Sequence, residues 1–160
     1  LLQKDYKIHI PVVHVILESK YDSLLGISAQ DLCIDVNLNL LSDISKRIRD
    51  CYAEEQSSRK GVANNATDTL ITKILLGTLG CVPAYDRYYM RSVKANKVSS
   101  GLYNKASVRS AAEFYCRYLD AFEDLRKEIS TNNVEYPPMK LIDMCFWQDG
   151  FISANKNADK

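Results

Sequence analysis

Two helical segments separated by Gly80 and Pro83 constrain the fold of this chain more than any other part of its sequence. Before the glycine, apolar residues recur at helical spacing and form one face: Leu70, Ile71, Ile74, Leu75 and Leu79. Thr67 or Asp68 is suited to cap the start of this helix, and Gly80 to end it. Because proline is favoured in the first turn of a helix, a second helix is predicted to begin near Pro83.

The predicted second helix has an acid at its start and bases along it. Asp86 falls in the first turn, where the partial positive charge of a helix N-terminus favours a carboxylate. Arg87, Arg91 and Lys94 follow at i, i+4 and i+7, which puts three cations on one face, and Lys97 lies close to them. This face is a candidate surface for an anionic partner.

Length and composition predict one domain with one core. The chain has 160 residues, of which 46% are hydrophobic, enough for a single sizeable core and too few to argue for two. We expect one helical domain over residues 1–152 and a polar tail over 153–160. The chain starts with Leu1 rather than Met, which leaves open whether a piece is missing upstream, through processing or cloning.

The cysteines and the hydropathy pattern indicate a soluble protein of a reducing compartment, with the cytoplasm as the expected location. Five cysteines occur without a CxxC pair, which argues against a disulfide framework, a structural zinc site or an iron–sulfur cluster. No apolar run is long enough for a membrane helix, and the N-terminus lacks the pattern of a secretory signal. We expect no metal, no cofactor and no membrane contact.

The first third of the chain also reads as helical. Pro11 opens an apolar run that suits a short helix or a strand, and we favour the helix because the rest of the chain is helical. Ser28 is predicted to cap a helix that runs to about Val36, and a longer amphipathic helix follows from Asn37. The polar segment 54–65 is predicted to be a loop.

The last third adds two further helices. After a loop over 98–106, Ser107 is predicted to cap one long helix with a buried aromatic and aliphatic stripe that ends at Ile129. Two prolines from Pro137 start a last helix, which we expect to end near Gly150. The predicted architecture is all-α, with about seven helices around one core.

Several segments from Leu70 to Trp147, about half of the chain, resemble the second half of the helix-hairpin-helix DNA glycosylase superfamily. They are the helix up to Leu79, then CVPAYDRYY, the basic helix, FYCRYLDAFEDL and LIDMCFW. The similarity extends to uncharacterised bacterial relatives with the patterns PxxDxxV, YxxYC and LDxxLW. The resemblance implies a DNA-glycosylase-like helical fold, a bacterial origin, double-stranded DNA as partner, and Asp86 as the catalytic aspartate.

The resemblance also implies a mechanism, that of a monofunctional DNA N-glycosylase-like hydrolase. The basic face would contact phosphates, and one base would be flipped into a pocket. Asp86 would stabilise positive charge on the sugar or orient a water. The phosphate-contacting residues would be Arg87, Arg91, Lys94 and Lys97. The aromatic residues that line the pocket would be Tyr85, Tyr89 and Trp147, the last of which is also suited to the edge of the core.

Departures from the superfamily pattern keep a second interpretation open. The glycine-rich hairpin is represented by Gly61 alone, and residues 67–69 stand where bifunctional members carry a nucleophilic lysine. Lys73 lies inside the helix, poorly placed to replace it, so a lyase mechanism is disfavoured. In the alternative, Asp86 only stabilises a helix start and the chain is a non-catalytic helical domain that binds a protein or nucleic-acid partner. An open cleft at Asp86 would favour the enzyme, and a covered carboxylate the alternative.

Overall fold

The computed structural model describes residues 6–57, 66–131 and 134–156 of the chain. Within these ranges the fold is all-α, as predicted: eight α-helices and two 3-10 helices with no strand, and a lone bridge between Thr131 and Val134. The elements are η1 (Tyr6–His9), α1 (Ile10–Ile16), η2 (Ser19–Leu24), α2 (Ala29–Leu32), α3 (Asp35–Ser57), α4 (Asp68–Thr78), α5 (Arg87–Ala95), α6 (Lys105–Arg117), α7 (Leu119–Ile129) and α8 (Pro138–Lys156). No helix in these ranges has the length and apolar character needed to cross a bilayer.

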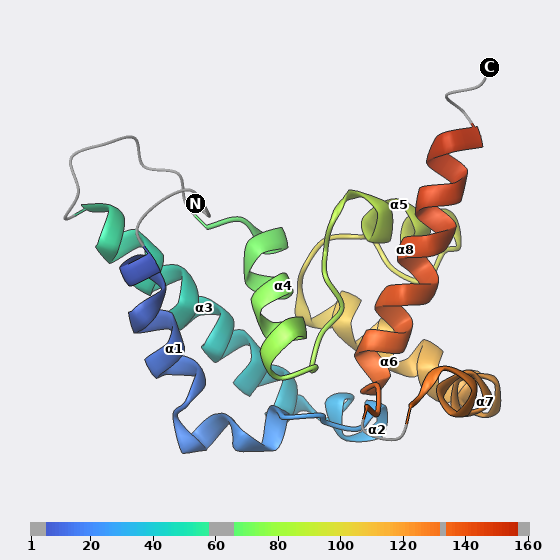
Figure 1. Cartoon of the computed structure of the whole chain (residues 1–160), viewed down its shortest axis with the longest axis horizontal. Coiled ribbons are helices and arrows are strands. Elements are labelled where there is room, and N and C mark those ends of the chain that lie inside the picture. The colour runs from blue at the N-terminus through green and yellow to red at the C-terminus, as the bar shows by residue number, and fades with distance from the viewer. Residues whose placement is uncertain (1–5, 58–65, 132–133, 157–160) are drawn as a thin grey trace.

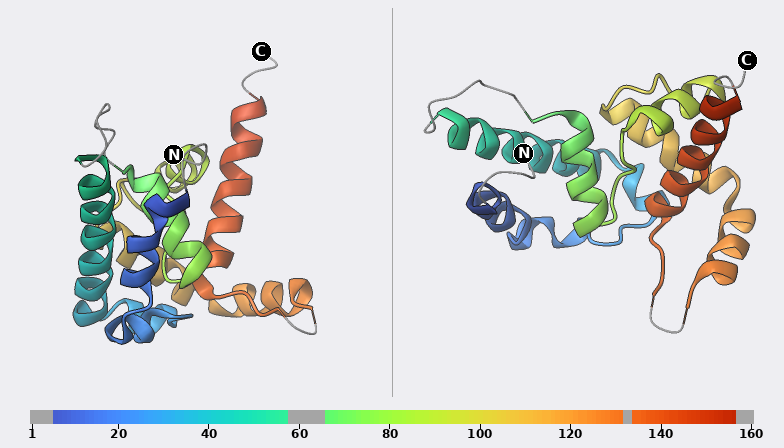
Figure 2. Two further views of the ribbon diagram at one scale, coloured as in Figure 1. Left: turned by 60° about the vertical axis from the view of Figure 1, so that its left-hand side comes forward. Right: turned by 45° about the horizontal axis from the view of Figure 1, so that its top comes forward.

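The helices form two groups on either side of α4. α1 packs along α3 on one side, and α5 packs extensively against α8 on the other (Figure 1). α6 contacts α2, α3 and α8, so it links the two groups. α7 lies at the edge of the molecule, to the right of the lower end of α8 in Figure 1, and Figure 2 shows the same arrangement from two other directions.

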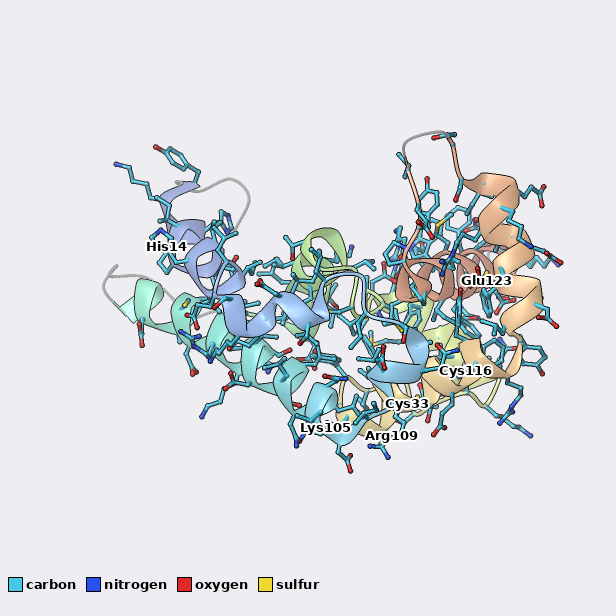
Figure 3. All side chains as sticks on the ribbon, turned by 90° about the horizontal axis from the view of Figure 1, so that it is seen from below. His14, Cys33, Lys105, Arg109, Cys116 and Glu123 are labelled. Carbon is cyan, nitrogen blue, oxygen red and sulfur yellow. The ribbon has the colours of Figure 1, made fainter. Side chains whose placement is uncertain are left out.

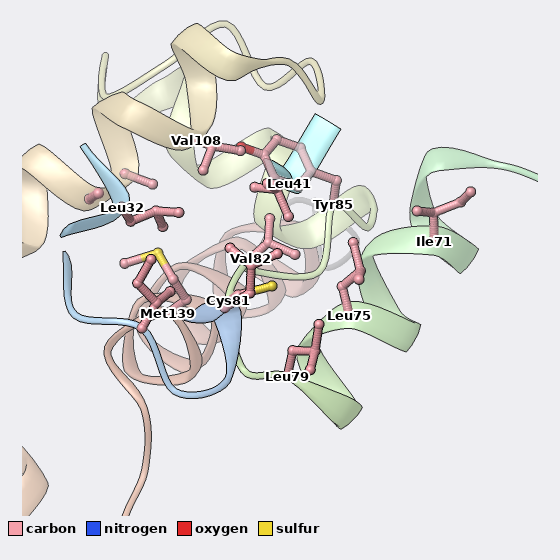
Figure 4. Close-up of a cluster of buried hydrophobic side chains, with 14 of the residues drawn as sticks. Leu32, Leu41, Ile71, Leu75, Leu79, Cys81, Val82, Tyr85, Val108 and Met139 are labelled. Carbon is pink, nitrogen blue, oxygen red and sulfur yellow. The ribbon is translucent and has the colours of Figure 1, made fainter. Parts of the chain in front are cut away.

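One hydrophobic cluster runs through the described part of the chain and includes residues from all eight α-helices. α4 and its C-cap residue contribute a row of aliphatic side chains, Ile71, Leu75 and Leu79, as the sequence pattern predicts (Figure 4). The connection after α4 passes through the same cluster, because the side chains of Val82 and Tyr85 are fully buried there. This continuous core agrees with the expectation of a single domain.

The start of α5 differs from the prediction. Pro83 lies in a non-helical connection, and α5 begins only at Arg87, with Asp86 as its N-cap in an extended conformation. Residues between the two helices use their backbone groups in contacts with side chains of α4 and α8 instead of starting a helix. The prediction for α4 is confirmed, since Thr67 caps its start and Gly80 follows its end with a φ of 65°.

The predicted long helix from Ser107 to Ile129 is wrong, because the chain breaks at Tyr118 into α6 and α7. The break changes how the aromatic residues of the two helices pack. Tyr115 and Phe122 stack with ring centroids 4.7 Å apart and planes at 18°. In one continuous helix, residues seven positions apart are separated by about 10.5 Å along the axis. The break therefore allows these two rings to stack.

Five helix ends also differ from the prediction. Asn104, not Ser107, caps α6, because its side-chain oxygen accepts the Ser107 N–H at 2.9 Å. α2 ends at Leu32, and α3 starts at Asp35 and extends into the segment predicted as a loop. α8 continues through Gly150 to Lys156, so the tail is helical over 153–156. The remainder of the predicted loop, 58–65, and residues 157–160 lie outside the described residues.

Candidate functional site

Asp86 lies at the N-terminus of α5 and points its two carboxylate oxygens in different directions. Oδ1 accepts hydrogen bonds from the backbone N–H groups of Tyr88 and Tyr89, at 3.0 and 3.1 Å. This is the usual geometry of a helix N-cap. Oδ2 lies 3.8 Å from the Nζ of Lys73 on α4, and the Asp86 side chain is 15% exposed. Oδ1 is thus used to cap α5, whereas Oδ2 faces the side chain of Lys73.

The backbone before Asp86 is held by side chains from two helices. The Ala84 N–H donates to Oδ1 of Asp143 on α8 at 2.9 Å. The Tyr85 N–H donates to Oγ1 of Thr72 on α4 at 2.9 Å, and the Thr69 hydroxyl donates to the Tyr85 carbonyl at 2.7 Å. Because these bonds fix the peptide groups just before it, the position of Asp86 is determined jointly by α4 and α8.

A surface cavity of about 310 Å³ lies beside Asp86, between α4 and α8. Two carboxylates and two lysines face it, and each lysine is paired with one carboxylate. The Lys140 Nζ lies 3.0 Å from Oδ2 of Asp143, and Lys73 pairs with Asp86 as described above. Four further residues complete the lining: Leu76, Ala84, Met144 and Trp147. The cavity therefore combines charge-paired polar groups with apolar and aromatic walls, as small-molecule sites commonly do.

The basic face of α5 is exposed as the sequence predicts. Arg87, Arg91 and Lys94 are all exposed, on the side of the helix opposite to buried residues such as Val93. Lys97 follows the helix, is exposed, and has a φ of 57°. Among the residues that the structure describes, Arg91, Lys94 and Lys97 form no ion pair with a carboxylate. They are therefore available to an anionic partner.

Two other cations of the same stretch are used elsewhere. Arg109 forms an ion pair with Asp35 at the start of α3, and Lys105 donates to the side-chain oxygen of Asn39. Figure 3 shows Lys105 and Arg109 together beside this end of α3. The six Lys and Arg residues between Asp86 and Arg109 are thus divided, and only the four on and just after α5 belong to the basic face.

Aromatic contacts connect the basic face of α5 with the cavity. The Arg87 guanidinium lies over the Tyr88 ring, 4.5 Å from its centroid. Tyr88 meets Trp147 edge to face at 5.4 Å, and Trp147 stacks on Phe151 at 5.1 Å with the planes 8° apart. Trp147 also lines the cavity, so a continuous series of contacts leads from an exposed arginine to the cavity wall.

The other two aromatic residues predicted to line a pocket lie in the hydrophobic core instead. Tyr85 and Tyr89 are fully buried, with ring centroids 5.0 Å apart, and neither lines the cavity beside Asp86. The Tyr85 hydroxyl donates to Oγ of Ser107, and burial raises the pKa of Tyr85 to about 12. These rings pack in the core and thereby support α5, whereas Trp147 is the predicted aromatic residue that reaches the cavity.

Sequence reasoning missed three polar residues of the cavity: Lys73, Lys140 and Asp143. Lys73 was considered only as a replacement for the nucleophilic lysine of bifunctional glycosylases, and its contact with Asp86, at 3.8 Å between Nζ and Oδ2, was not predicted. For the two on α8 a signal existed, because Lys140, Asp143 and Trp147 are spaced at i, i+3 and i+7 and therefore share one helix face. No such pattern connects Lys73 with Asp86 or with the residues of α8. Only the packing of α4 shows that Lys73 belongs to the cavity.

Comparison of the chain with protein-family models, with curated proteins and with solved structures found no match. The resemblance to DNA glycosylases therefore stays a prediction from the residues between Leu70 and Trp147. What the chain binds has to be inferred from its own cavity and its own charged surface.

Proposed function

We propose that the chain binds double-stranded DNA through the basic face of α5 and takes one flipped base into the cavity beside Asp86. The observation that carries the proposal is the continuity of these two features. Arg87 belongs to the exposed cations and stacks on Tyr88, which in turn contacts Trp147 in the cavity wall. A phosphate bound by the arginines and a base held at the tryptophan would thus lie on neighbouring surfaces.

The cavity has the chemistry that such a base requires. Its volume of about 310 Å³ is at the lower end of the range for ligand pockets, about 300–1,000 Å³. Trp147 offers an aromatic surface for stacking, a contact that contributes about 1–3 kcal/mol per base. Oδ2 of Asp86 lies in the wall, where a carboxylate could stabilise positive charge on the sugar during cleavage of an N-glycosidic bond. The proposed activity is therefore hydrolytic base release with one aspartate.

A second candidate function is a non-catalytic helical domain that binds DNA or a protein without acting on it. Two contacts favour this alternative. Oδ1 of Asp86 is fully engaged in capping α5, and Oδ2 is paired with Lys73. A carboxylate with these contacts already has a structural role, and the basic face alone would suffice for binding.

The first experiment measures binding to a short DNA duplex that contains an abasic-site analogue, at several salt concentrations. We expect affinity to fall steeply with salt, because cations that contact phosphates release bound counterions. The variant Arg91→Gln, Lys94→Gln should weaken binding and reduce the slope of log K against log salt by about 2, roughly 0.9 per lost contact.

A matched control removes the same charge elsewhere. Lys46 on α3 and Arg117 at the end of α6 are both exposed and lie outside the basic face. Lys46→Gln, Arg117→Gln should leave the salt slope close to that of the unmodified chain. Equal effects of the two double variants would mean that net charge, not the α5 face, determines binding, and would contradict the proposal.

The second experiment separates the two candidate functions. A duplex with 2-aminopurine reports base flipping by a rise in fluorescence, and base release is followed on duplexes with damaged bases. We expect Trp147→Leu to reduce flipping, and Asp86→Asn to abolish release while binding stays unchanged. Asn is chosen because it is as good an N-cap as Asp. Binding without flipping or release would support the non-catalytic alternative.

A further inference from the structure

A second and larger cavity, of about 620 Å³, lies on the opposite side of α8 from the cavity beside Asp86. The two are separated by the helix itself: Lys140, Asp143 and Trp147 face the first cavity, whereas residues such as Phe146 and Asp149 face the second. The second cavity is open to the surface and lies between α6, α7 and α8, beside Asn96, which caps the end of α5. Its lining residues are Asn96, Phe114, Tyr118, Ala121, Phe122, Leu125, Cys145, Phe146 and Asp149.

Four of its nine lining residues are aromatic: Phe114 on α6, Tyr118 at the break between α6 and α7, Phe122 on α7 and Phe146 on α8. Phe114 on α6 is the centre of the group and contacts Tyr118 at 4.7 Å, Phe146 at 5.1 Å and Phe122 at 6.3 Å between ring centroids. The break at Tyr118, which turns α7 away from α6, brings Phe122 to this group. The cavity therefore depends on the same irregularity that the sequence pattern did not predict.

One carboxylate supplies the formal charge of the lining. No Lys or Arg is among the residues that line the cavity in the described part of the chain, and Asp149 is its single charged side chain. Within the described residues, Asp149 accepts hydrogen bonds from the Ser92 hydroxyl and from the Asn96 amide, both at Oδ2. They hold the carboxylate in place at the edge of the cavity and leave Oδ1 for a further contact.

We propose that this cavity binds a small apolar molecule with one positive charge, such as a quaternary or protonated amine. Aromatic faces attract cations through their π electrons, and several rings around one cation are the known arrangement for quaternary ammonium groups. Asp149 adds the opposite charge at the edge. Because two donors already hold its carboxylate, its side chain loses little conformational entropy on binding. The volume lies within the range of small-molecule pockets. An anionic ligand would meet both the ring faces and the carboxylate, so it is disfavoured.

The test uses three probes that share one ring: benzyltrimethylammonium, benzyl alcohol and benzoate. Binding to the full chain is measured by calorimetric titration. We expect the cationic probe to bind at least tenfold more tightly than the neutral one, and benzoate to bind the weakest. Equal affinities, or no binding of the cation, would overturn the proposal. The site is independent of the proposed DNA activity, so Asp86→Asn should leave binding of the cation unchanged.

Two variants locate the binding. Ala121 is exposed on α7 and lines the cavity, so Ala121→Trp should fill the space and abolish binding without disturbing the core. Asp149→Asn keeps the shape and should weaken binding of the cation about tenfold while leaving benzyl alcohol unaffected. Asp120→Asn, at an exposed α7 position outside the lining, is the matched control and should have no effect. Full binding to Ala121→Trp, with folding verified by circular dichroism, would refute the assignment.

Discussion

Gly150 on α8 lies so close to Tyr88 on α5 that a β-carbon at this position would be 2.1 Å from the Tyr88 carbonyl oxygen. No real contact of this kind is so short, so the two helices can pack at this distance only with glycine here. Tyr88 is also the residue whose ring contacts Arg87 of the basic face and Trp147 of the cavity wall. The geometry of the candidate site thus depends on a residue that has no side chain.

Gly150→Ala is therefore expected to destabilise the protein. The atom it would meet is backbone, so the clash can be relieved only if α5 and α8 move apart, and we expect a loss at or above the upper end of the about 1–3 kcal/mol typical of overpacking. Gly77→Ala is the matched control, because a β-carbon there has no atom within 4 Å. Because Gly77 lies in the last turn of α4, the control should not lose stability and should gain at most about 0.5–1 kcal/mol, the effect of this substitution in a helix interior. Urea unfolding of both variants measures the difference, and similar stabilities would contradict the predicted clash.

Asp86 is expected to contribute to stability through its cap alone. Asp86→Ala removes the acceptor for the N–H groups of Tyr88 and Tyr89 and should cost about 0.5–2 kcal/mol, whereas Asp86→Asn should cost much less. Thermal unfolding of the two variants provides the measurement. If Asn were as destabilising as Ala, the negative charge and its pairing with Lys73 would matter more than the cap.

The sequence allowed the all-α class, α4 and the exposed basic face to be predicted, because these follow from local periodicity. Thr67 and Gly80 mark the ends of α4 by chemistry that acts within one helical turn. Gly150 misled the prediction for the opposite reason. A glycine commonly ends a helix, but here it serves the close approach of another helix, and nothing near it in the sequence distinguishes the two uses.

The candidate site was predictable only in part. Asp86 and the cations that follow it are neighbours in sequence, so their spacing was sufficient. The lining of the cavity is not local: Asp143 contacts Ala84 across 59 positions, and Lys73 reaches Asp86 from another helix. Tyr85 and Trp147 show the same limit, since both are aromatic and suited to a pocket or a core, and only packing decides between them.

Substitutions of Asp143 test whether its hydrogen bond to Ala84 holds the connection before α5 in place. It is buried, and its Oδ1 accepts the Ala84 N–H. Asp143→Leu would leave this buried N–H without its acceptor and should cost about 1–3 kcal/mol. Asp143→Asn retains an oxygen acceptor and should cost less. Hydrogen exchange at Ala84 gives a local measurement: we expect faster exchange in the Leu variant only, and unchanged exchange would show that the bond does not hold the connection.

The raised pKa of Tyr85 predicts that the protein loses stability at high pH. Burial raises the pKa of Tyr85 from 10.0 to about 12, so between these values the unfolded chain releases the phenolic proton while the folded chain keeps it. Its contribution is fully present below pH 10 and is lost as the pH rises towards 12. At 1.36 kcal/mol per pKa unit, the loss amounts to about 3 kcal/mol. Burial also raises the pKa of Tyr89, which acts in the same direction.

Tyr85→Phe should therefore flatten the alkaline fall in stability. At pH 7 the variant loses the hydrogen bond to Ser107 and should be less stable by about 1 kcal/mol. Between pH 10 and 12 the difference should shrink and then reverse, because Phe has no proton to release. Tyr6→Phe, at a residue that is 71% exposed, is the control and should follow the unmodified chain at every pH. Urea unfolding from pH 8 to 12 measures all three proteins, and parallel curves for the Tyr85 variant and the unmodified chain would disprove the assigned role of this hydroxyl.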